Sequence, residues 1–248
     1  MTASFEQVTR AQLAGEGPAR RFWARMAQAL LVAWAVDAVI ALLFGMHQDA
    51  LLHRYGDGEV SDLAGLRQAG NRADAVMRIS IWLTLLTAVA FVTWMFLESR
   101  RLEIQERPKR YRAGWTVGAW FVPVAGLLLP YEVMRDLWSA AFAHEDEFCI
   151  SAGCTARRSP HRLVTAWWCC LVSVAVLSTG ACVYPIVGVG ILPVVIAVDP
   201  LSVDAAHMTA SEMAFTNSGL IARNAVLLAA AVLAFVIVQR LAFRANDE

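Results

Sequence analysis

One apolar stretch, Gly114–Trp138, constrains the fold of this chain more than any other feature. It is hydrophobic enough to enter a bilayer, but Pro123, Gly126 and Pro130 interrupt it. Proline lacks a backbone donor and opposes a continuous helix, whereas glycine lets the chain reverse. Basic residues lie both before and after the stretch. Both of its ends are therefore expected on one side of a membrane, as a re-entrant or interfacial helical hairpin.

Four other stretches are apolar enough to cross a membrane. Of the 248 residues, 58% are hydrophobic, which exceeds the share in an ordinary soluble domain. A spanning helix needs roughly 20 mostly apolar residues. We expect an all-α membrane protein with one multi-pass domain, residues 21–244, between a disordered N-terminus, residues 1–20, and a short tail, residues 245–248. The four transmembrane helices are expected at about Phe22–Met46, Met77–Leu97, Leu163–Tyr184 and Gly219–Val238.

The distribution of Arg and Lys indicates which helix ends face the cytoplasm. With both termini inside, the inner segments carry 16 of the 21 cations, whereas the two outer loops carry three cations and eight acids. Cytoplasmic segments normally hold the excess of Arg and Lys. We therefore expect a cell-membrane protein with cytoplasmic N- and C-termini. The apolar segment Pro185–Val198 is too short for a further crossing at about 1.5 Å per residue, and its path stays open.

Aromatic residues gather at the inner ends of the predicted helices. Amphipathic rings concentrate at the water–lipid boundary of a membrane. We therefore expect the following side chains to anchor the helix ends at that boundary: Phe22, Trp23, Trp94, Phe96, Trp167 and Trp168.

A tryptophan-rich pattern surrounds the prolines of the hairpin. It reads W-x-x-G-x-W-F-x-P, with a second proline seven residues later. The pattern resembles a bacterial integral membrane family known only as domain of unknown function 4328, over about Phe22–Arg244. The resemblance implies a fold and a membrane location but no activity, and Gly126 stands where most members have Asn. The residues that carry it are Trp115, Gly118, Trp120, Phe121, Pro123, Gly126, Pro130, Tyr131, Arg135 and Trp138.

The environment of the hairpin follows from its backbone. Non-helical backbone at membrane depth must be buried in protein or must face water. We therefore expect the hairpin to be packed among the four helices. It either closes the bundle or lines a cavity or a lipid-headgroup pocket.

Two charged residues fall inside the predicted helices. Asp37 lies well within the first helix, where a carboxylate is costly unless it is paired or hydrated. Small residues beside it favour a position that faces the bundle interior. Arg223 falls in the same outer half of the bilayer, and its long side chain can reach toward the surface. We expect an Asp37–Arg223 ion pair; a proton- or cation-binding site and a carboxylate solvated by local water are the alternatives.

The second predicted helix carries a stripe of hydroxyl groups. Ser80, Thr84 and Thr87 follow one another at helical spacing. Such groups usually bond to their own helix backbone or to a neighbouring helix. That role is expected here, and a polar pathway is the alternative.

A basic loop follows the second predicted helix. Cation clusters beside a membrane helix attract anionic lipids by about 1 kcal/mol per cation. Membrane lipids, anionic headgroups included, are therefore the expected partners. A second copy of the chain or another membrane protein also stays open, and no nucleic acid is expected. The cations expected to face lipid are Arg100, Arg101, Arg107, Lys109, Arg110 and Arg112.

Histidine and cysteine residues gather in the second inner segment, in the order H-x4-C-x4-C-x6-H. Zinc favours four such ligands, but this spacing matches none of its common patterns. A reduced cytosolic loop is the preferred interpretation, and no cofactor is expected. The four residues are His144, Cys149, Cys154 and His161.

The sequence contains no catalytic motif of the G-x-S-x-G, H-E-x-x-H or Walker type. We therefore favour a non-enzymatic scaffold or regulatory component of the bacterial envelope, which acts through lipid or protein contacts of its basic inner face. The alternative is a small oligomeric transporter, with Asp37 as the coupling carboxylate and Trp34 along the substrate path. A membrane enzyme that uses His144 or His161 on lipid headgroups is the weakest alternative, because no nucleophile, base and orienting group can be named together.

Overall fold

The computed structural model describes residues 2–56, 63–122, 126, 128–151, 161–180 and 210–247. These residues form six helices, and none of the residues in these ranges forms a strand, so the predicted all-α class is confirmed. The helices are α1 (Thr2–Gly56), α2 (Leu63–Ile104), α3 (Trp115–Gly118), α4 (Leu129–Ser151), α5 (His161–Gly180) and α7 (Ala210–Asp247).

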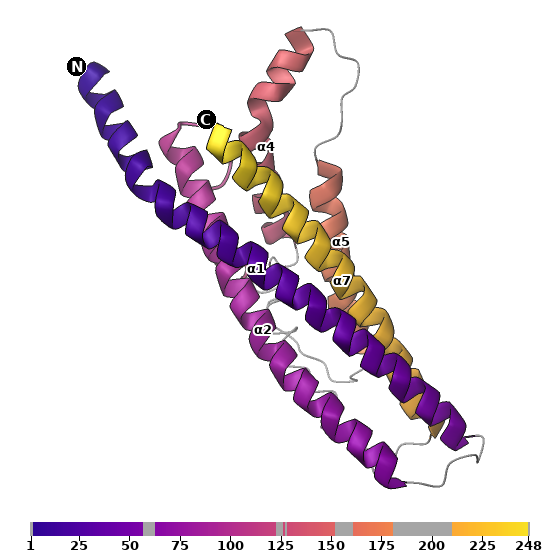
Figure 1. The fold of residues 1–248 in the computed structure, drawn as a ribbon. Coiled ribbons are helices and arrows are strands. Elements are labelled where there is room, and N and C mark those ends of the chain that lie inside the picture. The colour runs from indigo at the N-terminus through magenta and orange to yellow at the C-terminus, as the bar shows by residue number, and fades with distance from the viewer. Residues whose placement is uncertain are drawn as a thin grey trace.

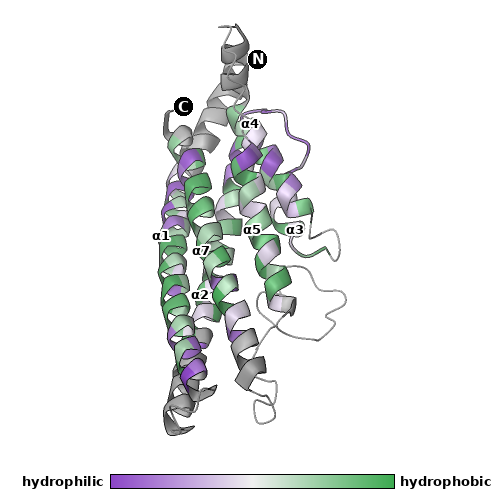
Figure 2. Cartoon of the chain, turned by 90° about the vertical axis from the view of Figure 1, so that its right-hand side faces the viewer, coloured by the Kyte–Doolittle hydropathy of each residue, from purple (hydrophilic) through white to green (hydrophobic). Residues whose placement is uncertain are grey.

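Four of these helices contain a segment that is long and apolar enough to cross a membrane. Within the described residues, these four agree by length and composition with the four predicted transmembrane helices, and they indicate a multi-pass membrane protein. Large apolar side chains such as Leu43, Trp82 and Val232 are exposed on their surfaces, as expected for helices that face lipid. In Figure 2 the hydrophobic colour runs along the helices. The segments are Gly17–Leu51, Arg78–Ile104, His161–Ser178 and Asn217–Phe243.

α1, α2 and α7 continue beyond their apolar segments. α1 begins at Thr2, whereas the polar composition of residues 1–20 indicates disorder. α2 and α7 also begin before the predicted starts, Met77 and Gly219. Helical backbone hydrogen bonds do not need apolar side chains, and the Ala, Gln, Glu and Arg of the first segment are good helix formers. The segment Pro185–Val198 lies outside the described residues.

The four helices with candidate membrane-spanning segments form a row in the order α2, α1, α7 and α5. α1 packs against both α2 and α7, and α7 also packs against α5. Figure 1 shows α1 and α7 running antiparallel, so that α1 begins at the end of the bundle where α2 and α7 finish. We call this the terminal end. α3 and the start of α4 contact α2 near this end, and α4 also contacts α5.

α1 and α7 approach closely at the other end of the bundle. A Cβ atom added to Gly45 of α1 would lie 3.0 Å from Cγ1 of Ile221 in α7. In the same region Nδ2 of Asn217 donates to the carbonyl oxygen of Gly45 at 3.0 Å and to Oδ1 of Asp49 at 3.2 Å. The absent side chain at Gly45 therefore lets α7 reach the backbone of α1, and the amide of Asn217 sets the register of the two helices.

α2 ends in a Schellman motif. The amide of Arg107 donates to the carbonyl oxygen of Leu102 at 3.0 Å, and the amide of Glu106 donates to that of Glu103 at 3.1 Å. Glu106 has a positive φ of 55°, the left-handed conformation that this motif requires after the helix. Pro108 then opposes further helix. The chain thus turns back toward α3.

An aromatic cluster joins α2, α5 and the segment between α3 and α4. The ring centroids of Phe91 in α2 and Trp167 in α5 are 5.6 Å apart, and those of Trp168 and Trp120 are 6.2 Å apart. Trp94 in α2 is 0% exposed, and Trp167 and Trp168 are also buried. The prediction that Trp94, Trp167 and Trp168 anchor the helices at the lipid boundary is therefore wrong. They pack inside the bundle, where Trp120 adds a ring against Trp168.

The close approach of α1 and α7 gives a test of the fold. We expect Gly45→Val to lower the free energy of unfolding by about 1–3 kcal/mol, because overpacking a tight contact has that cost. Gly219→Val is the matched control on α7, since a Cβ atom there meets nothing within 4 Å. Unfolding in detergent micelles would measure both variants. Equal losses in the two would contradict the contact between Gly45 and Ile221.

Candidate functional site

Glu98 is an acidic side chain buried at the terminal end, with an exposed fraction of 1%. Its Oε2 lies 3.4 Å from NH1 of Arg20 in α1, and its Oε1 lies 2.8 Å from NH2 of Arg101 in α2. A buried carboxylate needs such partners, because removing a charge from water costs several kcal/mol. Two guanidinium groups thus share one carboxylate, which holds α1 against α2 and leaves an excess of positive charge.

Lys109 binds the basic loop to the end of α2. Its Nζ donates to the carbonyl oxygen of Ser99 at 2.6 Å and to Oγ of Ser99 at 2.7 Å, and it lies 3.5 Å from Oε1 of Glu103. Burial lowers the pKa of Lys109, while the charge of Glu103 acts in the opposite direction. The ammonium group therefore points into the protein and stabilises the loop.

α4 contributes two acids that hold the same loop. Oδ2 of Asp136 accepts hydrogen bonds from the amides of Arg110 and Tyr111, at 2.9 and 3.0 Å. The hydroxyl of Tyr111 donates to Oε2 of Glu132, and this hydrogen bond raises the pKa of Tyr111. Because Asp136 satisfies two backbone donors of the loop, the loop and α4 form one structural unit.

The six cations predicted to face lipid fall into two groups. Arg101 and Lys109 turn inward to acids, so the prediction is wrong for these two. Arg101 compensates the buried carboxylate of Glu98, and Lys109 is held by two hydrogen bonds to Ser99. Arg110 and Arg112 are exposed, and the guanidinium of Arg100 lies over the ring of Phe96. For these three and Arg107, lipid contact stays a prediction.

The acidic partners were missed by the sequence analysis. Glu98, Glu103, Glu132 and Asp136 lie within or beside segments that are basic overall, so net charge hides them. The available signal was the spacing of Glu98 and Arg101, because residues three apart on a helix are neighbours. The signal was absent for Asp136, whose partners lie 25 and 26 residues away.

Part of the tryptophan and proline pattern faces inward. Trp120, Gly126, Pro130 and Trp138 are buried. Trp138 stacks on Phe142 at 4.7 Å between ring centroids. These residues therefore bury α4 and the turn before it against the bundle. Pro123 lies outside the described residues.

The rest of the pattern lies nearer the surface. Phe121 has an exposed fraction of 65%, and Trp115 is also exposed. Gly118 has open space where a Cβ atom would stand. The hydroxyl of Tyr131 lies 3.1 Å from Oγ1 of Thr165 in α5, and the guanidinium of Arg135 lies 5.7 Å from the centre of the Tyr131 ring.

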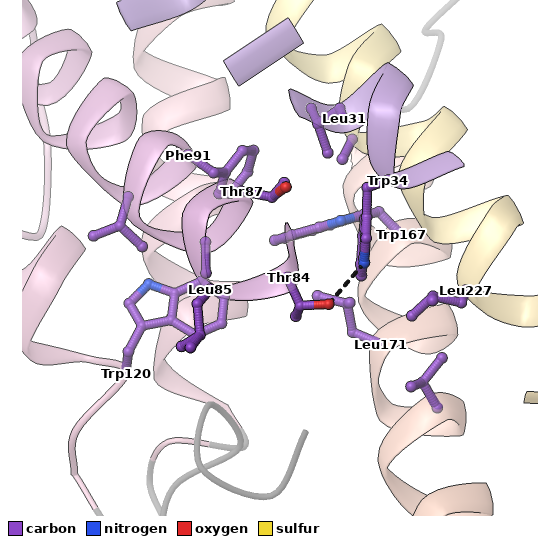
Figure 3. Close-up of a pocket in the computed structure, with 14 residues that line it drawn as sticks. Leu31, Trp34, Thr84, Leu85, Thr87, Phe91, Trp120, Trp167, Leu171 and Leu227 are labelled. Carbon is purple, nitrogen blue, oxygen red and sulfur yellow. Dashed lines mark hydrogen bonds between the residues drawn. The ribbon is translucent and has the colours of Figure 1, made fainter. Parts of the chain in front are cut away.

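An apolar cavity of about 90 Å³ lies beside the aromatic cluster. Figure 3 shows Trp34, Phe91, Trp120 and Trp167 around it. Nε1 of Trp34 donates to Oγ1 of Thr84 at 2.9 Å. The volume is well below the roughly 300–1,000 Å³ of a typical small-molecule site. Its lining is almost entirely apolar, and the hydroxyl groups of Thr84 and Thr87 are already hydrogen-bonded within the protein, so this cavity favours apolar occupants over charged ones.

The hydroxyl groups along α2 form hydrogen bonds within this helix and to its neighbour, as predicted. The hydroxyl of Ser80 donates to the carbonyl oxygen of Val76 at 3.0 Å, and that of Thr87 donates to the carbonyl oxygen of Leu83 at 2.7 Å. Thr84 accepts from the neighbouring α1. The hydroxyl groups are thus used for hydrogen bonds within and between helices.

Asp37 is buried, with an exposed fraction of 8%. Among the residues that the structure describes, none forms an ion pair with it, and the predicted Asp37–Arg223 pair is not made. The guanidinium of Arg223 instead donates to Oδ1 of Asn224 at 3.2 Å. The antiparallel register that brings Gly45 to Ile221 sets Arg223 opposite about Leu43, roughly six residues or about 9 Å along α1 from Asp37.

Of the four predicted metal ligands, only His161 has a described side chain. His144, Cys149 and Cys154 lie outside that set, so the metal hypothesis stays a prediction. Within the described part of the chain, no group of three or more His, Cys, Asp or Glu side chains is placed to hold an ion.

The buried carboxylate gives a test of the terminal end. We expect Glu98→Ala to lower the free energy of unfolding by about 3–5 kcal/mol, because it leaves buried charges uncompensated. Glu106→Ala removes an exposed carboxylate eight residues later and should change it by less than about 0.5 kcal/mol. Denaturant unfolding in micelles would compare them. Similar small effects in both would show that Glu98 does not hold α1 and α2 together.

Comparison with known proteins identifies a family but no relative of known activity. The family model described as domain of unknown function (DUF4328) matches residues 57–242. The match begins after α1, so it covers less of the chain than the sequence resemblance suggested. No curated protein and no solved structure matches the chain. Because the matched residues make up most of the 248, the chain belongs to the DUF4328 family.

Proposed function

We propose that this protein is a non-enzymatic scaffold or regulatory component of the cell membrane, with its terminal end in the cytoplasm. In this proposal Gly114–Trp138 is a re-entrant hairpin, and the terminal end is the working surface. It contacts lipid through its cations and other membrane proteins, or a second copy of the chain, through the exposed side of the hairpin. The main support is that the acids and many of the cations of the terminal end bind one another.

The paired charges support a structural role for the terminal end. Glu98 binds two arginines, and Lys109 binds Ser99 and Glu103. Asp136 accepts two backbone amides. A catalytic site needs a base or nucleophile aimed at a substrate, whereas these groups are aimed at each other. They make a rigid surface, which suits a binding function.

The depth of Trp120 supports the re-entrant hairpin. Trp120 lines the same cavity as Thr84 and Leu85. Along α2, Leu85 lies roughly 19 residues, or about 28 Å, before the last helical residue, Ile104. A surface loop would not extend so far along a helix that is apolar enough to span a membrane. The cation pattern then favours the cytoplasm for both limbs.

Exposed apolar side chains on the outer side of the proposed hairpin support its contact with another protein. Trp115, Val117, Phe121 and Leu128 are large apolar side chains that remain exposed. They come from α3 and the residues between α3 and α4, and the buried members of the same segment hold them in place. Aromatic side chains of this kind are enriched where proteins bind each other.

A photo-crosslinking experiment tests the scaffold. A crosslinking amino acid in place of Phe121 should yield a discrete protein adduct in membranes, because this side chain would contact the partner. The control is the same replacement at Trp82, an aromatic residue of α2 that is 68% exposed and should meet lipid. Gel analysis would compare the two. A protein adduct from neither position, or equally from both, would contradict a contact at the hairpin.

Asp37 supports a second candidate, a small oligomeric transporter coupled to protons or cations. Its carboxylate is buried in α1, and no hydrogen bond or ion pair joins it to another described residue. Intramembrane carboxylates of this kind often mark ion pathways. Trp34, one turn earlier, lines the apolar cavity.

Proton flux separates the two candidates. A transporter should move protons into liposomes along an imposed gradient, and Asp37→Asn should abolish the flux, as a pH-sensitive dye would show. Asp49→Asn is the control, because Asp49 is bound by Asn217 and lies three turns away on α1. Absence of flux in the native protein, or flux that survives Asp37→Asn, would reject a transporter that moves protons through Asp37.

A further inference from the structure

A polar crevice opens at the terminal end between α1, α2 and α7. It has a volume of about 180 Å³, roughly six times the share of one water molecule in the liquid. Of the described residues that line it, Glu98 alone is acidic. The polar lining consists of Arg20, Arg21, Arg25 and Gln28 from α1, Glu98 from α2 and Gln239 from α7.

The crevice carries a net positive charge. Three guanidinium groups face one carboxylate, and Glu98 is also shared with Arg101 outside the lining. Arg21 and Arg25 are exposed and lie four residues apart, so they project from the same side of α1 and repel each other. An anion bound between them would remove that repulsion.

The donors of the crevice suit a phosphate group. A guanidinium presents a planar fork of N–H groups that matches phosphate oxygens. Gln28 and Gln239 add amide donors from α1 and α7. Glu98 positions Arg20 at 3.4 Å, so one of the three arginines is already ordered before an anion arrives.

Apolar surface beside the crevice favours a lipid over a soluble anion. Phe243 lines it and is largely exposed, and Phe22 and Met26 of α1 are exposed next to Arg21 and Arg25. The crevice also lies at the end of the apolar segments of α1 and α7, where headgroups begin. A ligand with both a phosphate and acyl chains satisfies the two kinds of surface together.

We propose that this crevice binds the phosphate headgroup of an anionic membrane phospholipid. The phosphate lies between Arg21 and Arg25, with Gln28 and Gln239 as additional donors and Arg20 held in place by Glu98. The acyl chains lie along Phe22, Met26 and Phe243. This deepens the proposed function, because lipid contact at the terminal end is one part of it, and it names the lipid class and the site.

Native mass spectrometry of the detergent-solubilised full chain tests the site. The protein is titrated with phosphatidylglycerol or phosphatidylcholine of the same acyl chains. The native protein should bind the first phosphatidylglycerol at least about tenfold more tightly than phosphatidylcholine. Arg21→Gln with Arg25→Gln should remove that preference. A native protein without the preference would overturn the proposal.

The control removes the same charge elsewhere. Arg54 and Arg78 are exposed, lie at the opposite end of the bundle and do not line the crevice, so Arg54→Gln with Arg78→Gln should change the affinity by less than about twofold. Gln239→Leu tests the opposite wall of the crevice without altering charge and should weaken phosphatidylglycerol binding severalfold. Equal weakening by the two arginine pairs, or none from Gln239→Leu, would show attraction by overall charge rather than by this crevice.

A soluble analogue separates a lipid from a free phosphate compound. Glycerol 1-phosphate has the anionic group without acyl chains and should not compete at a concentration equal to that of the lipid. Equal competition would overturn the assignment to a lipid. The titration is independent of the crosslink at Phe121. If Phe121 gives no crosslink but the protein still prefers phosphatidylglycerol, the scaffold is rejected and the lipid site in the crevice is retained. If Phe121 gives the crosslink but the protein shows no preference for phosphatidylglycerol, only the lipid site is rejected.

Discussion

The contact of Trp120 with Trp168, and through Trp167 with Phe91, is the interaction on which the shape of the bundle depends. α2 and α5 stand at opposite ends of a row of four helices, separated by α1 and α7. The aromatic rings bring these outer helices together at the level of Phe91, midway along the apolar segment of α2. Aromatic side chains bury about 150–250 Å² each, and their pairs add roughly 0.5–1.5 kcal/mol beyond that burial. Trp120, which follows α3, thus helps to convert an open row into a closed bundle at this level.

Ion pairs and hydrogen bonds to charged groups organise the terminal end of the molecule. A surface rich in arginine and lysine would need no internal order if its only task were to set the topology of the chain in a membrane. Here Glu98, Glu103 and Asp136 instead hold Arg101, Lys109 and two backbone amides of the basic loop. Because those acids pair with particular cations, other cations remain exposed on the surface at fixed positions. Arg21 and Arg25 beside the crevice are the clearest case.

The family match adds a distinction between α1 and the rest of the chain. Residues 57–242 contain α2, α3, α4 and α5, and most of α7. Asp37 and the three arginines of the crevice belong to α1, which precedes the matched residues. Glu98 and Gln239 belong to the matched part. The crevice therefore combines residues from both parts of the chain, and its arginines are supplied by the part that the family model does not describe.

The sequence by itself determined the features that follow from local chemistry. Long apolar segments require a membrane and a helix, so the all-α class and the four candidate spans could be predicted. The hydroxyl groups of Ser80, Thr84 and Thr87 were also predictable, because their partners lie on the same helix or the next one. The prolines predicted a break between the second and third apolar helices. Of the described residues between α2 and α4, only Trp115–Gly118 form an α-helical turn, and α4 begins at Leu129.

Only the tertiary structure decided which residues meet. The Asp37–Arg223 pair failed because the close approach at Gly45 sets the register of α1 and α7, and one absent side chain is not visible in a hydropathy pattern. Trp94, Trp167 and Trp168 resembled boundary anchors, since a buried tryptophan and an interfacial one have the same sequence context until a covering segment is placed on them. Glu98 was missed for a related reason. Its partner Arg20 lies 78 residues away, and only the packing of α1 against α2 brings the two charges out of water together.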